Sequence, residues 1–179
     1  KLSVEAVQRE GPRAWKDVEF VAMVTPDVPA MYHPVIELMG FAVKVVRCPL
    51  EPSDIRNAKI ADEVTRDGAM GITEMVKIEV FRWAQYHRVL LVDVDILFHK
   101  NFDELFEFDA ALGWTHGGIP QEKLNGGFLV VNPARDGERH YGAILDILKE
   151  GDFRSGSGWR GSGVGWVYGG RTIQGLLPY

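Results

Sequence analysis

The sequence contains a single cysteine, Cys48, among its 179 residues. One cysteine cannot form a disulfide within the chain or build a cysteine-based metal site, so it indicates neither an oxidising nor a reducing compartment. Basic runs are also absent, and the formal net charge of −5 provides no electrostatic footprint for nucleic acid. An anionic ligand would therefore need a metal ion or local hydrogen-bond donors.

Long apolar runs are missing as well. No segment reaches the length of a membrane span, and no basic-then-apolar leader opens the chain, so we expect no membrane segment here. The compartment, cytosol or Golgi lumen, is not indicated. The sequence has no initiating methionine and ends abruptly at Lys1 and Tyr179, from which we expect a fragment truncated at both ends.

Apolar stretches typical of strands alternate with segments of helical character. We expect strands at residues 18–25, 41–46, 89–92, 110–114 and 124–133. We expect helical segments at residues 2–10, 35–39, 72–85, 102–108 and 135–149, with a short helix in the polar stretch 51–71. Strands alternating with helices form βαβ units, which predicts an α/β fold with a mostly parallel sheet flanked by helices. The length suits a single domain.

Two carboxylates follow the apolar run at residues 89–92. This run, VLLV between charged flanks, suits a strand buried on both faces of a parallel sheet. Asp93 and Asp95 come next, and alternate residues of an extended chain project to the same face. Ligands bind at the carboxyl ends of strands in open α/β sheets, so we expect a divalent cation here. A solvated turn or a helix N-cap would also explain an Asp pair.

Lys77 and three histidines could take part in a binding site, but each also has a simpler structural explanation. Lys77 stands among apolar neighbours in the expected helix at residues 72–85, although a helical lysine ordinarily keeps its charged end in solvent. His87, His99 and His116 lack the i, i+4 spacing of a helical metal pair. We therefore assign no metal ligation to these histidines.

Glycine is concentrated in two places. Gly126 and Gly127 follow Asn125 at the start of an apolar strand, where glycines let the backbone approach a ligand closely or simply make a tight turn. Residues 151–170 hold eight glycines together with Trp159, Trp166 and Tyr168. This stretch predicts an ordered loop over a ligand, since it is too aromatic for a flexible linker.

Four segments occur in the order and at the spacing found in one known family. They resemble the glycogenin-like retaining glycosyltransferases, family 8, and the similarity covers roughly residues 18–177. The segments are Lys77, Asp93-Val94-Asp95, Asn125-Gly126-Gly127 and Gln174-Gly175-Leu176-Leu177. The resemblance implies that residues 1–179 are one catalytic domain with a GT-A-like, Rossmann-type fold, and that the chain is a UDP-sugar-dependent hexosyltransferase.

The resemblance implies a metal and donor site around the Asp pair. Asp93 and Asp95 would bind Mn²⁺ (or Mg²⁺), Asp95 more firmly, and Asp93 would also lie near the ribose, with Val94 in the same donor site. Lys77 would contact the phosphate or the sugar of the donor. Hard carboxylate oxygens suit these cations, and a divalent ion stabilises the negative charge on a departing UDP as a Lewis acid.

The resemblance also implies a sugar site and retention of the anomeric configuration. Asn125, Gly126 and Gly127 would line the sugar pocket, and Gln174 would lie beside the anomeric carbon. A double displacement needs a carboxylate nucleophile, whereas Gln174 is neutral. This favours front-face attack through an oxocarbenium-like species, with Gln174 as an electrostatic or positioning group. The acceptor, whether carbohydrate, protein or lipid-linked, and the donor sugar are not specified.

Departures from the family pattern keep two other functions open. Ile173 stands where glycogenin-like members often carry Asp, the segment between Asn125 and Gln174 is longer, and the family's first strand and its late third metal ligand are missing. A non-catalytic nucleotide-sugar-binding paralogue is therefore one alternative. The other is a phosphatase of the haloacid dehalogenase type, although the motif of those enzymes has Thr or Val at the position of Leu97.

Overall fold

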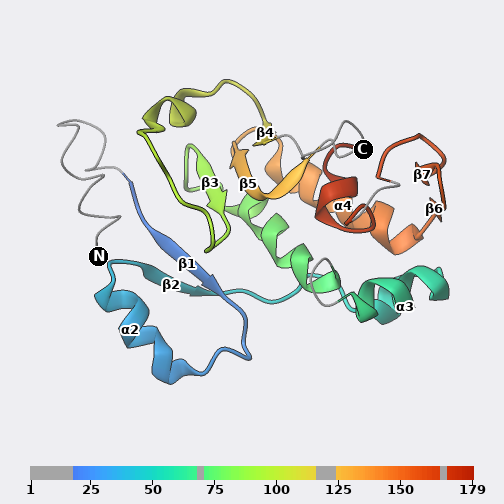
Figure 1. Ribbon diagram of the computed structural model, residues 1–179, viewed down its shortest axis with the longest axis horizontal. Helices are drawn as coiled ribbons and strands as arrows, with labels where there is room; N and C mark the ends of the chain where they lie inside the picture. The colour runs from blue at the N-terminus through green and yellow to red at the C-terminus, as the bar shows by residue number, and fades with distance from the viewer. Residues whose placement is uncertain (1–17, 68–70, 116–123, 166–168) are drawn as a thin grey trace. The chain divides into compact units, whose positions relative to one another are not determined.

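The computed structural model describes residues 18–67, 71–115, 124–165 and 169–179 (Figure 1). Within them the chain is a mixed α/β protein with small parallel and antiparallel sheets. It divides into two compact units, residues 1–47 with 98–103, and residues 48–97 with 104–179. The helix expected at residues 2–10 lies outside the described part of the chain.

The first unit contains a strand–helix–strand motif. Strand β1 (Val21–Val24) is followed by a 3-10 turn, η2 (Ala30–Tyr32), helix α2 (His33–Leu38) and strand β2 (Ala42–Val45). The two strands are parallel, as a helical crossover requires. The helix stops before Gly40, which has a φ of +95° that a side chain would disfavour. The βαβ unit expected from the sequence is thus confirmed.

The second unit holds a three-stranded sheet formed by β3 (Val89–Val92), β4 (Leu112–Thr115) and β5 (Asn125–Val131). Its order is β3-β5-β4, with β5 in the middle (Figure 1), and β5 is antiparallel to both neighbours. The expectation of a mostly parallel sheet is therefore wrong for the described strands. An apolar run identifies a strand but does not give its direction, which depends on the connections between strands.

Strand β3 differs from the expected strand in burial too. All four of its residues are only half-buried, and within the described residues it pairs on one side alone, with β5. Strand β5 is the buried one, with Leu129, Val130 and Val131 in the core. The prediction that residues 89–92 are covered on both faces is thus wrong, since a strand at the edge of a small sheet has fewer neighbours to cover it.

The segment before β3 is a 3-10 helix, η4 (Ile72–Arg82), instead of an α-helix. A 3-10 helix has three residues per turn, so side chains three positions apart are eclipsed and form straight ridges. Met75, Ile78 and Phe81 form one ridge and are fully buried. The expectation of a helix here is confirmed, and its geometry is tighter than expected.

The largest helix of the second unit, α4 (Gly137–Glu150), packs against η4. Its buried face contains Ile144, Leu145 and Leu148, and the helix expected at residues 135–149 is confirmed. Gly137 permits the contact, because a Cβ at this position would lie 2.0 Å from the carbonyl oxygen of Phe81. Shorter helices complete the chain: η3 (Pro52–Asp54), α3 (Ala58–Arg66), η5 (Asp103–Glu107) and α5 (Ile173–Leu176). No helix in the described residues is both long and apolar enough to cross a bilayer.

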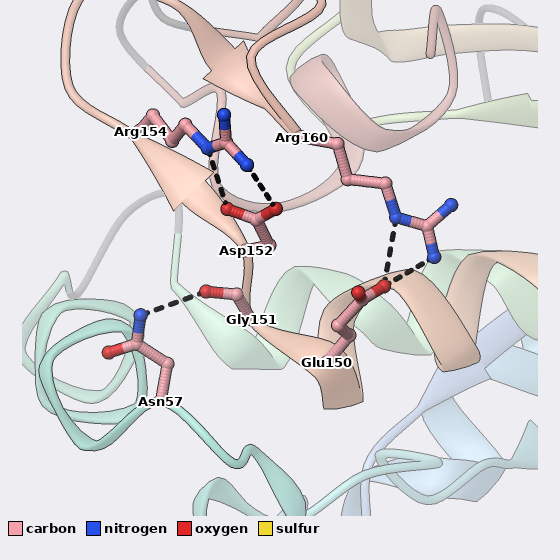
Figure 2. A network of polar contacts seen from close by, with 6 residues as sticks. All are labelled: Asn57, Glu150, Gly151, Asp152, Arg154 and Arg160. Atoms are coloured by element: carbon pink, nitrogen blue, oxygen red, sulfur yellow. Dashed lines mark hydrogen bonds and ion pairs between the residues drawn. The ribbon is translucent and has the colours of Figure 1, made fainter.

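The glycine-rich stretch contains a small hairpin of β6 (Phe153–Arg154) and β7 (Gly158–Trp159). Ion pairs fix its base (Figure 2). Arg154 donates two hydrogen bonds of 2.9 Å to the carboxylate of Asp152, and the guanidinium of Arg160 pairs with Glu150 at the end of α4. The stretch is thus an ordered loop in its described residues. Trp166 and Tyr168 lie outside them.

Candidate functional site

A largely buried lysine lies between two carboxylates in the second unit. The Nζ atom of Lys77 is 2.7 Å from Oε2 of Glu74 and 2.9 Å from Oδ1 of Asp93. It also donates a hydrogen bond of 3.3 Å to the carbonyl oxygen of Gly126. Only 12% of the lysine side chain is exposed, against 21% for Glu74 and 38% for Asp93. The ammonium group is therefore enclosed by acceptors, and Asp93 is the most open of the three side chains.

The 3-10 geometry of η4 explains the first contact. Glu74 and Lys77 are three residues apart, so their side chains are eclipsed on one ridge next to the buried ridge of Met75, Ile78 and Phe81. The position of Lys77 is thus determined by the packing of the same helix against the core.

Two opposing influences act on the charge of Lys77. Burial is the largest and lowers the pKa of its ammonium group. Hydrogen bonds and charge from Glu74 and Asp93 together outweigh burial, so the pKa of Lys77 lies above its usual value. Lys77 therefore keeps a full positive charge at neutral pH, directly beside the carboxylate of Asp93.

Backbone contacts between β3 and β5 position Asp93. Its N–H donates a hydrogen bond of 2.8 Å to the carbonyl oxygen of Gly127, extending the pairing of the two strands. The N–H of Gly127 in turn donates a 2.8 Å hydrogen bond to Oδ1 of Asn125. These contacts bring Asp93, Asn125 and Gly127 together, although Asp93 and Gly127 are far apart in the sequence.

Gly126 links this group to the start of α5. A Cβ on Gly126 would lie 3.2 Å from Cγ2 of Ile173, 3.6 Å from Cγ of Gln174 and 3.9 Å from Oε2 of Glu74. Gln174 and Glu74 therefore approach the same glycine from two different elements. Ile173 is fully buried beside them and supplies only apolar surface.

The glycine-rich loop supports Gln174 from the other side. A Cβ on Gly169 would lie 3.0 Å from the side-chain carbonyl oxygen of Gln174. Next to it, the carbonyl oxygen of Gly170 accepts a 2.8 Å hydrogen bond from Nε1 of the buried Trp159. Gly175 packs on Gly170 so tightly that a Cβ there would be 1.8 Å from the same carbonyl oxygen. The position of Gln174 thus depends on the fold of this loop.

Two residues of the expected site are open to solvent. Val94 is fully exposed, and Asp95 is exposed at the turn after β3. Within the described residues no three side chains of His, Cys, Asp or Glu converge as a metal-binding group. His87 and His99 are exposed, and His116 lies outside the described residues. A cation at this turn would need ligands beyond those that the described residues bring together.

Glu74 is a member of the group that the sequence did not single out. A signal was present, since Glu74 and Lys77 have the i, i+3 spacing at which opposite charges meet on a helix. Such pairs are common on solvent-exposed helix faces, so the spacing alone did not distinguish this one.

Comparison with known proteins adds no further identification. No protein-family model matches the chain, and a search of curated proteins finds no match either.

Proposed function

We propose that this chain is the catalytic core of a retaining, UDP-sugar-dependent hexosyltransferase of the glycogenin-like kind, with a GT-A-like fold. One observation carries the proposal. The resemblance assigns six residues to one donor site, and in the structure each of them contacts at least one other member of the set. The six are Lys77, Asp93, Asn125, Gly126, Gly127 and Gln174. They come from η4, β3, β5 and α5, so closeness in sequence does not explain their meeting.

The residues present fit a divalent cation in their chemistry. Asp93 and Asp95 offer hard oxygen ligands, and the 38% exposure of Asp93 leaves its carboxylate accessible. Mn²⁺ or Mg²⁺ would be held by these two carboxylates together with oxygens of the donor pyrophosphate and water. Bound there, the ion would supply Lewis-acid stabilisation of the leaving diphosphate.

The chain's own residues supply charge and orientation. Lys77 is charged and poorly hydrated, so its attraction to a donor phosphate would be stronger than that of a solvent-exposed lysine. The glycines at 126 and 127 are buried, and the space that their side chains would take is filled by Ile173 and Gln174 at the first and by Asp93 and Asn125 at the second. In the proposal these glycines therefore let the polar side chains of the site pack against the strand. Gln174 is a neutral amide held in place by the glycine-rich loop, which suits a group that orients a sugar and stabilises developing positive charge.

A non-catalytic nucleotide-sugar-binding protein is the second candidate, and the buried Ile173 favours it. Beside Gly126 and Gln174 this residue provides apolar surface where relatives often have a carboxylate. Such a protein would bind UDP and metal through Lys77 and Asp93 without turning over a donor.

The test is sugar transfer and hydrolysis by the protein with Mn²⁺, using UDP-glucose, UDP-galactose and their N-acetyl forms as donors. We expect metal-dependent turnover of one donor, which Asp95→Asn abolishes. Asp146→Asn is the matched control, because Asp146 is an exposed carboxylate on α4 and its loss should leave turnover unchanged.

Binding measurements separate the remaining outcomes. If UDP and Mn²⁺ bind but no donor turns over, the protein is the binding module. If neither UDP nor Mn²⁺ binds, the Asp pair is an ordinary polar turn and both functions are refuted.

A further inference from the structure

We propose that Glu74 is a positioning residue that acts through Lys77. It holds the ammonium group beside Gly126 and thereby frees Asp93 to engage a divalent cation. This inference rests on the proposed function, because it assumes that Asp93 is a ligand of that cation.

The three acceptors of Lys77 differ in what they can do. Oε2 of Glu74 makes the shortest contact, at 2.7 Å, and comes from the same helix as the lysine. The carbonyl oxygen of Gly126, at 3.3 Å, carries no net charge. Asp93 contacts the lysine with both carboxylate oxygens, at 2.9 and 3.1 Å, and is also the most exposed of the three. Of these three acceptors, Asp93 is therefore the one most accessible to a ligand from solvent.

A cation at Asp93 would compete with Lys77. Each positive charge repels the other, and the carboxylate oxygens that now contact the ammonium group would turn to the metal. Lys77 would then keep Glu74 and the carbonyl oxygen of Gly126. Without the charge of Glu74, a buried ammonium group would be left with one neutral acceptor, which is unfavourable. Without Glu74, Lys77 would therefore keep its contact with the carboxylate of Asp93, and the cation would bind to Asp93 more weakly.

Helix geometry makes Glu74 suitable for this role. The eclipsed i, i+3 relationship in η4 keeps Glu74 next to Lys77 regardless of what Asp93 does. Glu74 is also largely buried, so solvent screens its charge less than that of an exposed residue.

The experiment is a double-mutant cycle of Glu74→Gln and Lys77→Met, read by calorimetric titration with Mn²⁺ in the presence of UDP. We expect Glu74→Gln alone to weaken Mn²⁺ binding about tenfold, which corresponds to the coupling typical of residues in one ionic network. In the Lys77→Met background the same change should alter Mn²⁺ affinity by about twofold or less. Unfolding in urea is measured for each variant to confirm that it is folded, and Lys77→Gln replaces Lys77→Met if the latter does not fold.

Glu79→Gln is the matched control. Glu79 is a largely buried carboxylate of the same helix, and within the described residues it bonds to Tyr141 and Arg82. Its loss should leave Mn²⁺ affinity unchanged. If Glu74→Gln weakens binding equally with and without Lys77, Glu74 acts by itself and the positioning role is refuted. If the unaltered protein binds no Mn²⁺, the proposed function fails first, and this inference fails with it.

Discussion

The carboxylate of Asp93 lies against the backbone of Gly127. The two residues share a backbone hydrogen bond of 2.8 Å, and Oδ2 of Asp93 is 3.0 Å from the position that a Cβ on Gly127 would occupy. Oδ1 of Asn125 is 3.1 Å from the same position. The absence of a side chain at position 127 is therefore what allows Asp93 to point toward Lys77.

Gly127→Ala should weaken Mn²⁺ binding about tenfold, because the new methyl group would push the Asp93 carboxylate out of place, a strain of the order of 1 kcal/mol or more. Calorimetric titration measures the effect. Gly126→Ala is the comparison, since its Cβ would meet Ile173 and Gln174 before any atom of Asp93. An equal loss of Mn²⁺ affinity in both variants would contradict this explanation.

Gly175→Ala should destabilise the protein by about 3 kcal/mol. Its Cβ would be 1.8 Å from the carbonyl oxygen of Gly170, which is the acceptor for Trp159. The free energy of unfolding in urea reports this loss. Gly142→Ala, inside α4, has nothing within 4 Å of its Cβ and should instead stabilise the protein by about 0.5–1 kcal/mol through helix propensity.

Tyr141 should lose its proton at a higher pH than an ordinary tyrosine. Burial, followed by its 2.7 Å hydrogen bond to Glu79 and the charge of that carboxylate, raises the pKa of Tyr141 to about 12. Because the unfolded chain loses this proton nearer the ordinary tyrosine pKa of 10.0, the contribution of Tyr141 to stability is complete below that pH and is lost as the pH rises toward 12. Ultraviolet absorbance should show a tyrosinate that forms at a higher pH than that of an ordinary tyrosine. Absence of that group from Tyr141→Phe identifies it.

Asn57 should contribute to stability in two separable ways (Figure 2). Its Oδ1 caps α3 by accepting hydrogen bonds from Lys59 N and Ile60 N, and its Nδ2 donates a 2.9 Å bond to the carbonyl oxygen of Gly151. Asn57→Ala loses both and should cost about 2 kcal/mol. Asn57→Asp keeps the cap and loses the donor, so its cost in urea unfolding should be smaller. Equal costs would mean that the cap contributes little.

The sequence predicted the elements of the fold better than their arrangement. The βαβ unit could be predicted because its signals are local: two apolar strands, a short helix and the stop at Gly40. The direction of β3 relative to its neighbour could not be predicted, because the run of residues 89–92 is equally apolar in a parallel and in an antiparallel sheet. Its burial followed from the number of neighbouring strands, which is also a property of the whole sheet.

The 3-10 geometry of η4 could not be predicted from the sequence for a different reason. Met75, Ile78 and Phe81 are spaced by three, and a helix of either kind places two such neighbours on roughly one side. In an α-helix, each step of three residues falls about 60° short of a full turn, whereas a 3-10 helix closes it. Packing against α4, α5 and β3 distinguishes the two forms, and the spacing of apolar residues does not.

The residues of the candidate site could also be predicted only in part from the sequence. Lys77, Asp93 and Gln174 could be named from motif order, and the structure brings all three to Gly126 and Gly127. Glu74 could not be singled out, because its importance comes from burial and from its distance to Lys77. Asp95, expected beside Asp93 in a metal site, is exposed.

The straight ridges of η4 also constrain how its sequence can change in length. Each residue of a 3-10 helix turns the chain by about 120°, so removing Val76, between Met75 and Lys77, would rotate one ridge into the place of another. The core and the charged pair would then lose their partners together. Insertions and deletions in this segment should therefore be tolerated only in multiples of three, so its length is as restricted as the identity of its residues.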